Sequence, residues 1–387
     1  MADTADEIVT SILQNALDYR ASDIHIEPER DHLNIRFRID GILHLFNKVD
    51  KYLKENTISK IKVLSNMNIA ERRQPQDGHF EFLYKSVLYN FRVSILPALF
   101  GENIVIRILN REDMLLKLNN TGLERDQLLM IHKLLLSTSG MILITGPTSS
   151  GKTNLLYSIL DFLNRPFRNI ITLEDPIEYR IEGIRQSQVN ESIGFTFAKA
   201  MRSVIRQDPD IIMLGEIRDA DTTRMAIQAA LIGTLVLSTF HTFDVPALVT
   251  RLLEMGITHV VVAQTIKAVI TSRLVRKICT SCRSAFVPNS DEKKLVGENV
   301  ATLFKAKGCH LCKATGYLGR TGIYEITYFD NDIKTAIVEN QPVSYLNQLL
   351  KKKQIHSLKT SALNKVYGGI TSIEEIYRVL GSELLNE

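Results

Sequence analysis

The sequence has no tryptophan, only four cysteines among 387 residues, and no apolar run long enough to cross a membrane. Its most apolar window, residues 226–240, is short and broken by Gly233, which predicts a helix leading into a buried strand. Residues 1–17 are acidic and lack the basic and then apolar segments of a secretory signal. We therefore expect a soluble, cytoplasmic protein.

Charge of one sign is also not in large excess. The 47 lysines and arginines are interspersed with 43 acidic residues, which leaves a net charge of +4. A basic face with aromatic side chains, which is typical of nucleic-acid binding, is therefore not expected. The composition is that of a globular protein, and the length predicts two or three domains.

One segment carries a strong chemical signal. Residues 146–153 read GPTSSGKT and stand between an apolar strand, MILIT, and a helical segment, NLLYSILDFLN. In this context the pattern predicts a phosphate-binding loop, whereas a Gly/Ser-rich turn with a chance lysine is the weaker interpretation. The glycines let backbone N–H groups point at an anion, with the helix N-terminus behind them. The expected nucleotide-binding residues are Gly146, Pro147, Thr148, Ser149, Ser150, Gly151, Lys152 and Thr153. Lys152 is expected to reach the β and γ phosphates, and the Thr153 hydroxyl to ligate Mg²⁺.

The first hundred residues predict a small α+β domain. After an opening helix, residues 21–46 alternate apolar and polar side chains as in a hairpin with one buried face. A helix is expected over 55–71, with further strands around 79–96 and 102–109, before a polar linker. The residues expected on the buried face are Ile24, Ile26, Leu33, Ile35, Phe37 and Ile39.

From residue 123 helices alternate with apolar strands, which predicts an α/β fold with a parallel sheet covered on both faces. Ligands bind at the carboxyl ends of such strands, so the turns there should converge on one site. The expected strands are 141–145, 168–175, 210–216 and 234–242, and the expected helices are 123–137, 154–164, 197–207 and 222–233.

Three acidic residues and one histidine follow these strands. Glu216 is the first candidate to hold Mg²⁺ through water or to polarise the attacking water, against a role as a helix cap. Glu174 and Asp175 form a second acidic turn, where we expect an auxiliary acid for Mg²⁺ or the attacking water, with Glu174 as a catalytic residue and Asp175 in the nucleotide site. Asp175 before Pro176 also fits a plain N-cap with proline at N1. His241 is expected near the γ phosphate, against a purely structural role.

The four cysteines form two C-x-x-C pairs, Cys279 with Cys282 and Cys309 with Cys312, separated by 26 residues. Four thiolates at this spacing can close a tetrahedral structural Zn²⁺ site, and free thiols are the alternative. A helical tail follows, and Ser372 with Glu375 predicts a capping box for its last helix.

These segments together resemble the secretion-superfamily ATPases, the hexameric motors of type II secretion and type IV pilus systems. The resemblance rests on the GPTSSGKT, ITLEDPIEY, RQDPDIIMLGEIRD and LVLSTFHT segments, in that order, and on ASDIHIEP, RIDGIL, AERRQPQDG, RVSILP and TGYLGRTGIYEI. It implies a RecA-like P-loop motor domain after a PAS-like domain whose Arg92 and Arg107 contact the nucleotide. For either arginine a surface ion pair is the alternative.

The resemblance further implies a cytoplasmic homohexamer that hydrolyses ATP with Mg²⁺ and meets the inner membrane only through a polytopic platform protein and an accessory cytoplasmic protein. The tetracysteine element favours assembly of a pilus or pseudopilus over pilus retraction. A zinc-ribbon nucleic-acid translocase is the other alternative, although no nucleic acid is expected as a partner. The expected divisions are a PAS-like N-terminal domain (1–110), a linker (111–122), the ATPase domain (123–275), a zinc-binding subdomain (276–325) and a helical C-terminal region (326–387).

Two departures from the family pattern stand in its histidine segment. Thr234 follows Gly233 where the family usually has a first histidine, and Phe243 replaces the usual asparagine. Only His241 is therefore carried over. The chain also begins directly at the PAS-like domain, so we expect either a truncated or a naturally short, competence-like member.

Overall fold

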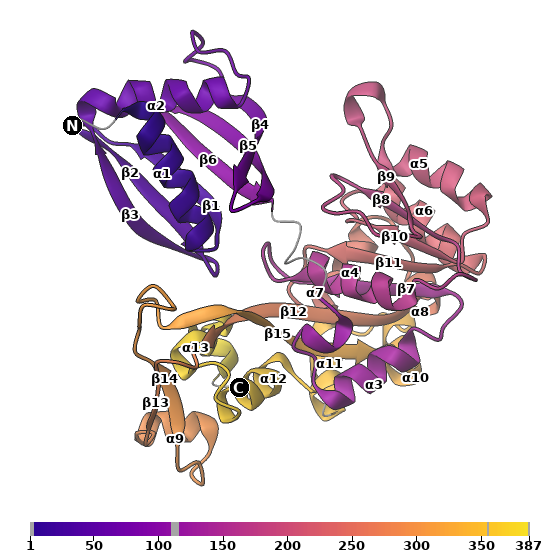
Figure 1. Ribbon diagram of the computed structural model, residues 1–387. Helices are drawn as coiled ribbons and strands as arrows, with labels where there is room; N and C mark the ends of the chain where they lie inside the picture. Colours follow the sequence, from indigo (N-terminus) through magenta and orange to yellow (C-terminus); the bar gives the residue numbers. More distant parts are fainter. Residues whose placement is uncertain (1–3, 110–115, 354–355, 386–387) are drawn as a thin grey trace. The chain divides into compact units, whose positions relative to one another are not determined.

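A computed structural model describes residues 4–109, 116–353 and 356–385, without the side chains of 382–385 (Figure 1). It divides into two compact units, residues 1–114 and 115–387. Among the described residues, no helix combines the length and the apolar composition that a membrane span needs. Part of the expected linker, residues 111–115, lies outside the described residues.

The first unit is an antiparallel sheet in the strand order β3-β2-β1-β6-β5-β4, packed against two helices. The residues expected on the buried face of the hairpin are all less than 9% exposed and belong to one core. The helices are α1 (Ala5–Asp18) and α2 (Lys51–Leu64), and the strands are β1 (Ala21–Pro28), β2 (His32–Ile39), β3 (Ile42–Asp50), β4 (Gln76–Tyr84), β5 (Val87–Ala98) and β6 (Gly101–Leu109).

Two predictions for this unit were wrong in detail. Helix α2 begins after Asp50 and ends at Leu64, because Asn66 takes a left-handed backbone conformation with φ of 57°. The helix expected at 55–71 was therefore placed too late in the chain. The segment 79–96 forms two strands and not one, since Lys85 and Ser86 both have positive φ and make a tight turn between β4 and β5.

The second unit is built on a seven-stranded sheet in the order β15-β12-β7-β11-β10-β8-β9, in which only the β12–β15 pair is antiparallel. The predicted α/β fold with a parallel sheet is confirmed. The strands are β7 (Gly140–Thr145), β8 (Ile170–Glu174), β9 (Arg185–Gln188), β10 (Ile211–Leu214), β11 (Leu235–Phe240), β12 (Ile266–Ile278) and β15 (Tyr317–Tyr328).

Helices cover both faces of this sheet. Successive side chains along a strand point to opposite faces, and each face forms a separate core with its own helices. Met141 and Leu143 face one core, and Ile142 and Ile144 face the other. The first core includes α5 (Phe197–Val204), α6 (Ala220–Leu231), α7 (Val245–Glu254), α8 (His259–Thr265) and α10 (Asn331–Val338), and the second includes α3 (Arg125–Leu134) and α4 (Lys152–Leu163). The short 3₁₀ helices of the described residues are η1 (Leu118–Asn120), η2 (Glu191–Ile193) and η3 (Ile205–Gln207).

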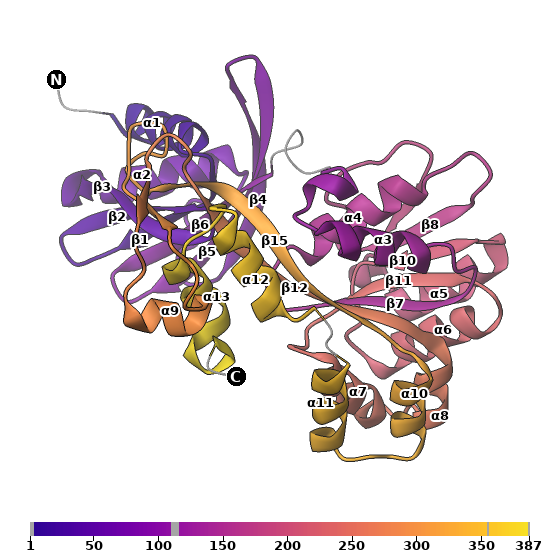
Figure 2. The same cartoon turned by 90° about the horizontal axis from the view of Figure 1, so that it is seen from below.

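Strands β12 and β15 form a long ribbon that leaves the sheet and leads to the cysteine-bearing element (Figure 1 and Figure 2). A small core between this ribbon and the surrounding helices contains Val275 and Ile323. The ribbon crosses the expected divisions at 275/276 and 325/326. The remaining elements are β13 (Arg283–Phe286), α9 (Ser290–Val296), β14 (Leu303–Ala306), α11 (Val343–Lys352), α12 (Leu358–Tyr367) and α13 (Ile373–Leu385).

The expected capping box at the last helix is present only in part. The Ser372 hydroxyl accepts the Glu375 N–H at 3.2 Å. The Glu375 carboxylate is fully buried and forms ion pairs with Arg276 at 2.8 Å and with Arg378 at 2.5 Å. The acidic residue therefore ties α13 to β12.

Candidate nucleotide site and cysteine cluster

The loop between β7 and α4 has the backbone that its glycines predict. Gly146 and Gly151 have φ of 147° and 87°, and Ser149 also has a positive φ, 63°. A Cβ at Gly146 would lie 2.6 Å from the Ser150 hydroxyl oxygen and 2.6 Å from the Ser272 carbonyl oxygen, so no side chain fits there. Gly151 is the N-cap of α4, which places the loop at a helix N-terminus.

Lys152 begins α4 and is buried, with its ammonium turned back onto the loop. Its Nζ donates hydrogen bonds to the carbonyls of Gly146 at 2.8 Å and Pro147 at 2.9 Å. Burial lowers the pKa of Lys152 to about 8, although the Glu216 carboxylate opposes this shift. The charge is thus held by neutral dipoles, which an anionic ligand can replace.

The loop offers further polar groups to a phosphate. The Ser150 hydroxyl is buried and has no hydrogen-bond partner in the part of the chain that the structure describes, which is unusual for a hydroxyl in a protein interior. Thr148, Ser149 and Thr153 are exposed, and Pro147 is half-buried. The orphaned hydroxyl and the glycine cradle fit a nucleotide phosphate, and the exposed Thr153 hydroxyl on the first turn of α4 could ligate Mg²⁺.

Glu216 and His241, expected at neighbouring strand ends, lie together. The His241 ring Nε2 is 3.2 Å from the Glu216 carboxylate, which is 16% exposed and is also paired with Arg218. The structure does not support the alternative of a helix cap, because Asp219 caps α6 by accepting the Thr222 N–H at 2.8 Å. Glu216 is therefore free of a capping role and acts on the charge of Lys152.

The second acidic turn is arranged differently. The Glu174 carboxylate is buried, and it accepts hydrogen bonds from the hydroxyls of Tyr157 and Thr172 and from the Gln186 amide. Asp175 is exposed, and no helix follows Pro176, so the alternative of an N-cap with proline at N1 is wrong. The structure thus separates the two acids, one held inside and one facing solvent.

The two arginines expected to contact the nucleotide lie in the first unit. Arg92 on β5 and Arg107 on β6 stand directly opposite each other in the strand register, and both are exposed. The Arg107 Nε donates a hydrogen bond to Asp23 at 2.9 Å. Like charges opposite each other on a sheet are destabilising, and one carboxylate offsets only one of them.

Arg273 on β12 is a site residue that we did not expect. Its side chain is buried beside the phosphate loop, and its guanidinium would lie 3.2 Å from a Cβ at Gly146. Arg273 is the one charged residue in the otherwise uncharged stretch 268–275, and this is the signal in the sequence that could have drawn attention to it.

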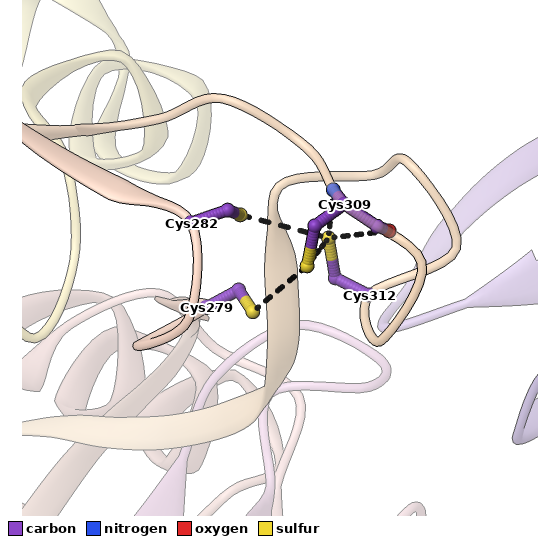
Figure 3. Close-up of side chains that lie close together, drawn as sticks. All are labelled: Cys279, Cys282, Cys309 and Cys312. Carbon is purple, nitrogen blue, oxygen red and sulfur yellow. Dashed lines mark hydrogen bonds between the residues drawn. The ribbon is translucent and has the colours of Figure 1, made fainter.

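The four cysteines converge from two loops (Figure 3). Their Sγ atoms are 3.8 Å apart for Cys279 and Cys309, 3.8 Å for Cys282 and Cys312, and 3.7 Å for Cys309 and Cys312. A tetrahedral site with zinc–sulfur bonds of about 2.3 Å separates sulfurs by about 3.8 Å. The thiols are far beyond disulfide distance, and they fit a structural zinc ion.

Backbone N–H groups also support thiolate charge in this cluster. Burial raises the pKa of Cys312, but N–H groups of Cys309 at 3.1 Å and Gly316 at 3.2 Å outweigh it and lower that pKa to about 7. Metal-binding thiolates are commonly stabilised in this way.

Comparison with known proteins places these features in one family. The type II/IV secretion system protein family matches residues 2–378. The chain belongs to this family. Type II secretion system protein E of Dickeya dadantii is 40% identical over 377 residues, which cover 97% of this chain and 76% of that protein. The type IV pilus assembly ATPase PilB of Myxococcus xanthus is 39% identical over 389 residues, which cover 97% of this chain and 69% of PilB.

Solved structures show the same fold for this family member. The ATPase DotB of Legionella pneumophila has a TM-score of 0.69 and 23% identity, with 97% of this chain and 95% of DotB covered. The pilus retraction motor PilT with bound ADP has a TM-score of 0.62 and 24% identity, with 95% of both chains covered. The predicted family and the predicted class of enzyme, a secretion or pilus ATPase, are confirmed.

Proposed function

We propose that this family member is the ATP-hydrolysing motor subunit of a machine that assembles a pilus or a pseudopilus. The observation that carries the proposal is the glycine-cradled loop with Lys152, next to the Glu216–His241 pair at the neighbouring strand ends. The relatives named above are a type II secretion protein and a type IV pilus assembly ATPase. The cysteine cluster also supports an assembly motor, as the tetracysteine element of the sequence does. These observations favour assembly over retraction and over nucleic-acid translocation.

Each residue of the site has a proposed role in hydrolysis. Backbone N–H groups of residues 146–151 bind the phosphates, and Lys152 leaves the carbonyls of Gly146 and Pro147 to contact the β and γ phosphates. The Thr153 hydroxyl would hold Mg²⁺, which would supply charge neutralisation at the phosphates, and Asp175 would contribute to the nucleotide site.

Glu216 is proposed as the acid that orients and polarises water for attack on the γ phosphate. The His241 imidazole holds the Glu216 carboxylate and senses the γ phosphate. The buried bonds of Glu174 favour a supporting role over direct action on water, with the carboxylate fixing the β8 end through Tyr157. Arg92 and Arg107 are proposed to approach the phosphates from the first unit.

The remaining proposals concern the assembly. We propose a homohexamer in the cytoplasm, peripheral to the inner membrane through a polytopic platform protein and an accessory cytoplasmic protein. The four cysteines would hold a structural zinc ion. The five divisions of the chain given above stay a proposal. Strand β12 is shared between the ATPase domain and the zinc-binding subdomain, and β15 between that subdomain and the helical C-terminal region.

Steady-state ATP hydrolysis and nucleotide binding test this function in three variants. Lys152→Ala is expected to lose hydrolysis and to bind ATP only weakly, because the phosphates lose their buried cation. Glu216→Gln is expected to bind ATP but to hydrolyse it roughly 10² to 10⁴ times more slowly, since the amide cannot accept a proton. Lys294→Ala, an exposed lysine on α9, is the control and should behave like the unmodified protein. Normal turnover by the Gln variant would remove Glu216 from the mechanism.

A further inference from the structure

The buried guanidinium of Arg273 lies where two parts of the nucleotide site meet. It is 8% exposed and donates hydrogen bonds to the carbonyls of Ser272 at 2.9 Å and Phe243 at 3.5 Å. The Phe243 ring centroid is 5.9 Å from its central carbon, so the guanidinium lies beside this aromatic ring. Arg273 thus connects β12 with the loop that follows His241.

Arg273 also lies beside the phosphate loop. Strand β12 runs parallel to β7 with Thr271 opposite Thr145, so the next residues of β12 lie along the loop. Gly146 meets Arg273 on one side, and its carbonyl accepts a bond from Lys152. Two cations therefore flank the first glycine of the loop.

Among the described residues, the charge of Arg273 has no carboxylate at ion-pair distance. In the part of the chain that the structure describes, its guanidinium makes no ion pair with a carboxylate and bonds only to neutral carbonyls. Burial lowers the pKa of Arg273, and the more distant Glu325 and Asp244 oppose this shift only partly. Buried charges in proteins are normally paired, so an unpaired arginine beside a phosphate loop indicates an anion that arrives from outside.

We propose that Arg273 is a second cation for the phosphate chain of the nucleotide, supplied by the same chain as the loop and held in place by Phe243. This inference rests on the proposed function. Arginine suits the task because its planar fork binds phosphate oxygens through two parallel hydrogen bonds. On ATP binding its bond to the Phe243 carbonyl, the longer of the two, is the one expected to yield.

Substitution by a neutral side chain of similar length separates this role from a structural one. Arg273→Met is expected to weaken ATP binding about tenfold or more, as the loss of a charged hydrogen bond does. Without nucleotide the same variant should melt at the same or a higher temperature than the unmodified protein, because it removes an unpaired buried charge. If Arg273 only stabilised the fold, Arg273→Met would instead melt at a lower temperature and keep its affinity for ATP.

Arg276→Met is the matched control. Arg276 lies on the same strand and is also largely buried, but it is paired with Glu375 at 2.8 Å and stacks on the Tyr317 ring. This variant should lose stability and keep its affinity for ATP. Arg273→Lys retains the charge, and ATP binding no tighter than that of the Met variant would overturn the proposal.

Fluorescently labelled ATP and thermal unfolding with and without ATP provide the two readouts. The unmodified protein and Lys152→Ala are measured alongside, so that failure of the proposed function is recognised by the unmodified protein itself not binding ATP. If the unmodified protein binds and Arg273→Met binds equally well, only the role of Arg273 is overturned.

Discussion

Lys152 carries its charge where burial opposes it. The Lys152 ammonium has two carbonyl partners and a pKa of about 8. It therefore loses its proton more readily than an ordinary lysine, whose pKa is about 10.4. Because the folded pKa lies below the unfolded one, the folded state binds fewer protons between these two values. Its stability therefore rises with pH across that window, and below pH 8 the full penalty of the buried charge is present.

Nucleotide binding should depend on this proton. Phosphates favour the charged form of Lys152, so ATP affinity is expected to fall as pH rises above 8, approaching tenfold per pH unit. The phosphates themselves no longer titrate there, since the second pKa of a phosphate is about 6. Binding of labelled ATP from pH 7 to 10 measures this slope.

The control for this pH dependence is a lysine outside the site. Lys152→Met should bind ATP weakly with a flat pH profile, whereas Lys199→Met, at an exposed position on α5, should keep the full slope. A slope that persists in Lys152→Met would assign the titration to another group.

The sequence predicted those site residues whose positions depend on local spacing. The phosphate loop and the Glu216–His241 pair were predictable, because alternating strands and helices put β10 and β11 side by side in a parallel sheet. The direction of the Glu174 side chain was not, since it depends on Tyr157 from α4. Arg273 lies about 120 residues beyond the loop, so the sequence can single out its charge but only the tertiary structure shows that it belongs to this site.

At the scale of elements, β12 connects the two chemical sites of the second unit. Its Ser272 donates a hydrogen bond to the Ser150 carbonyl at 2.7 Å, and its last residue, Ile278, directly precedes Cys279. Neither β12 nor β15 was predicted. Their sequences carry polar residues among apolar ones, and their pairing joins segments about 50 residues apart, which spacing along the chain does not reveal.

We predict that zinc holds the cysteine element together. Protein purified without added metal should contain about one zinc ion per chain by elemental analysis, because four thiolates this close repel one another unless a cation joins them. Cys282→Ser should lose zinc and lower the melting temperature, since metal binding contributes directly to the folding of such elements.

The neighbouring Ser281→Ala, an exposed change between the paired cysteines, is the control and should keep its zinc. Zinc near zero in the unmodified protein, with four readily titrated thiols, would contradict a structural metal.

The whole molecule divides its proposed catalytic residues between two compact units. The phosphate loop belongs to residues 115–387, whereas Arg92 and Arg107 belong to residues 1–114. Neighbouring arginines on β5 and β6 leave an excess of positive charge at an exposed face, and a phosphate is the anion that the proposed function supplies.

Substitution of one arginine tests this division. Arg107→Gln is expected to retain its fold and its nucleotide binding but to lose hydrolysis by on the order of 10³ to 10⁵, as for other arginines that contact a transferred phosphoryl group. Arg36→Gln is the control, because Arg36 is also paired with a carboxylate, Glu27, and lies on β2 of the same sheet, which β1 separates from β6. Equal losses in both variants would indicate a general effect of charge on the first unit.

Mixing two inactive variants decides whether the arginine acts within one chain or between chains. In a ring, a Lys152→Ala subunit can offer its intact Arg107 to the intact phosphate loop of an Arg107→Gln subunit, so the mixture should recover part of the activity that neither variant has alone. Specific activity of the unmodified protein should rise with concentration for the same reason, since dilution separates the two halves of each site. If the arginine acted only within its own chain, the mixture would stay inactive, because no chain in it has both groups. A flat concentration dependence in a sample shown to be monomeric would lead to the same conclusion and would remove the need for a ring.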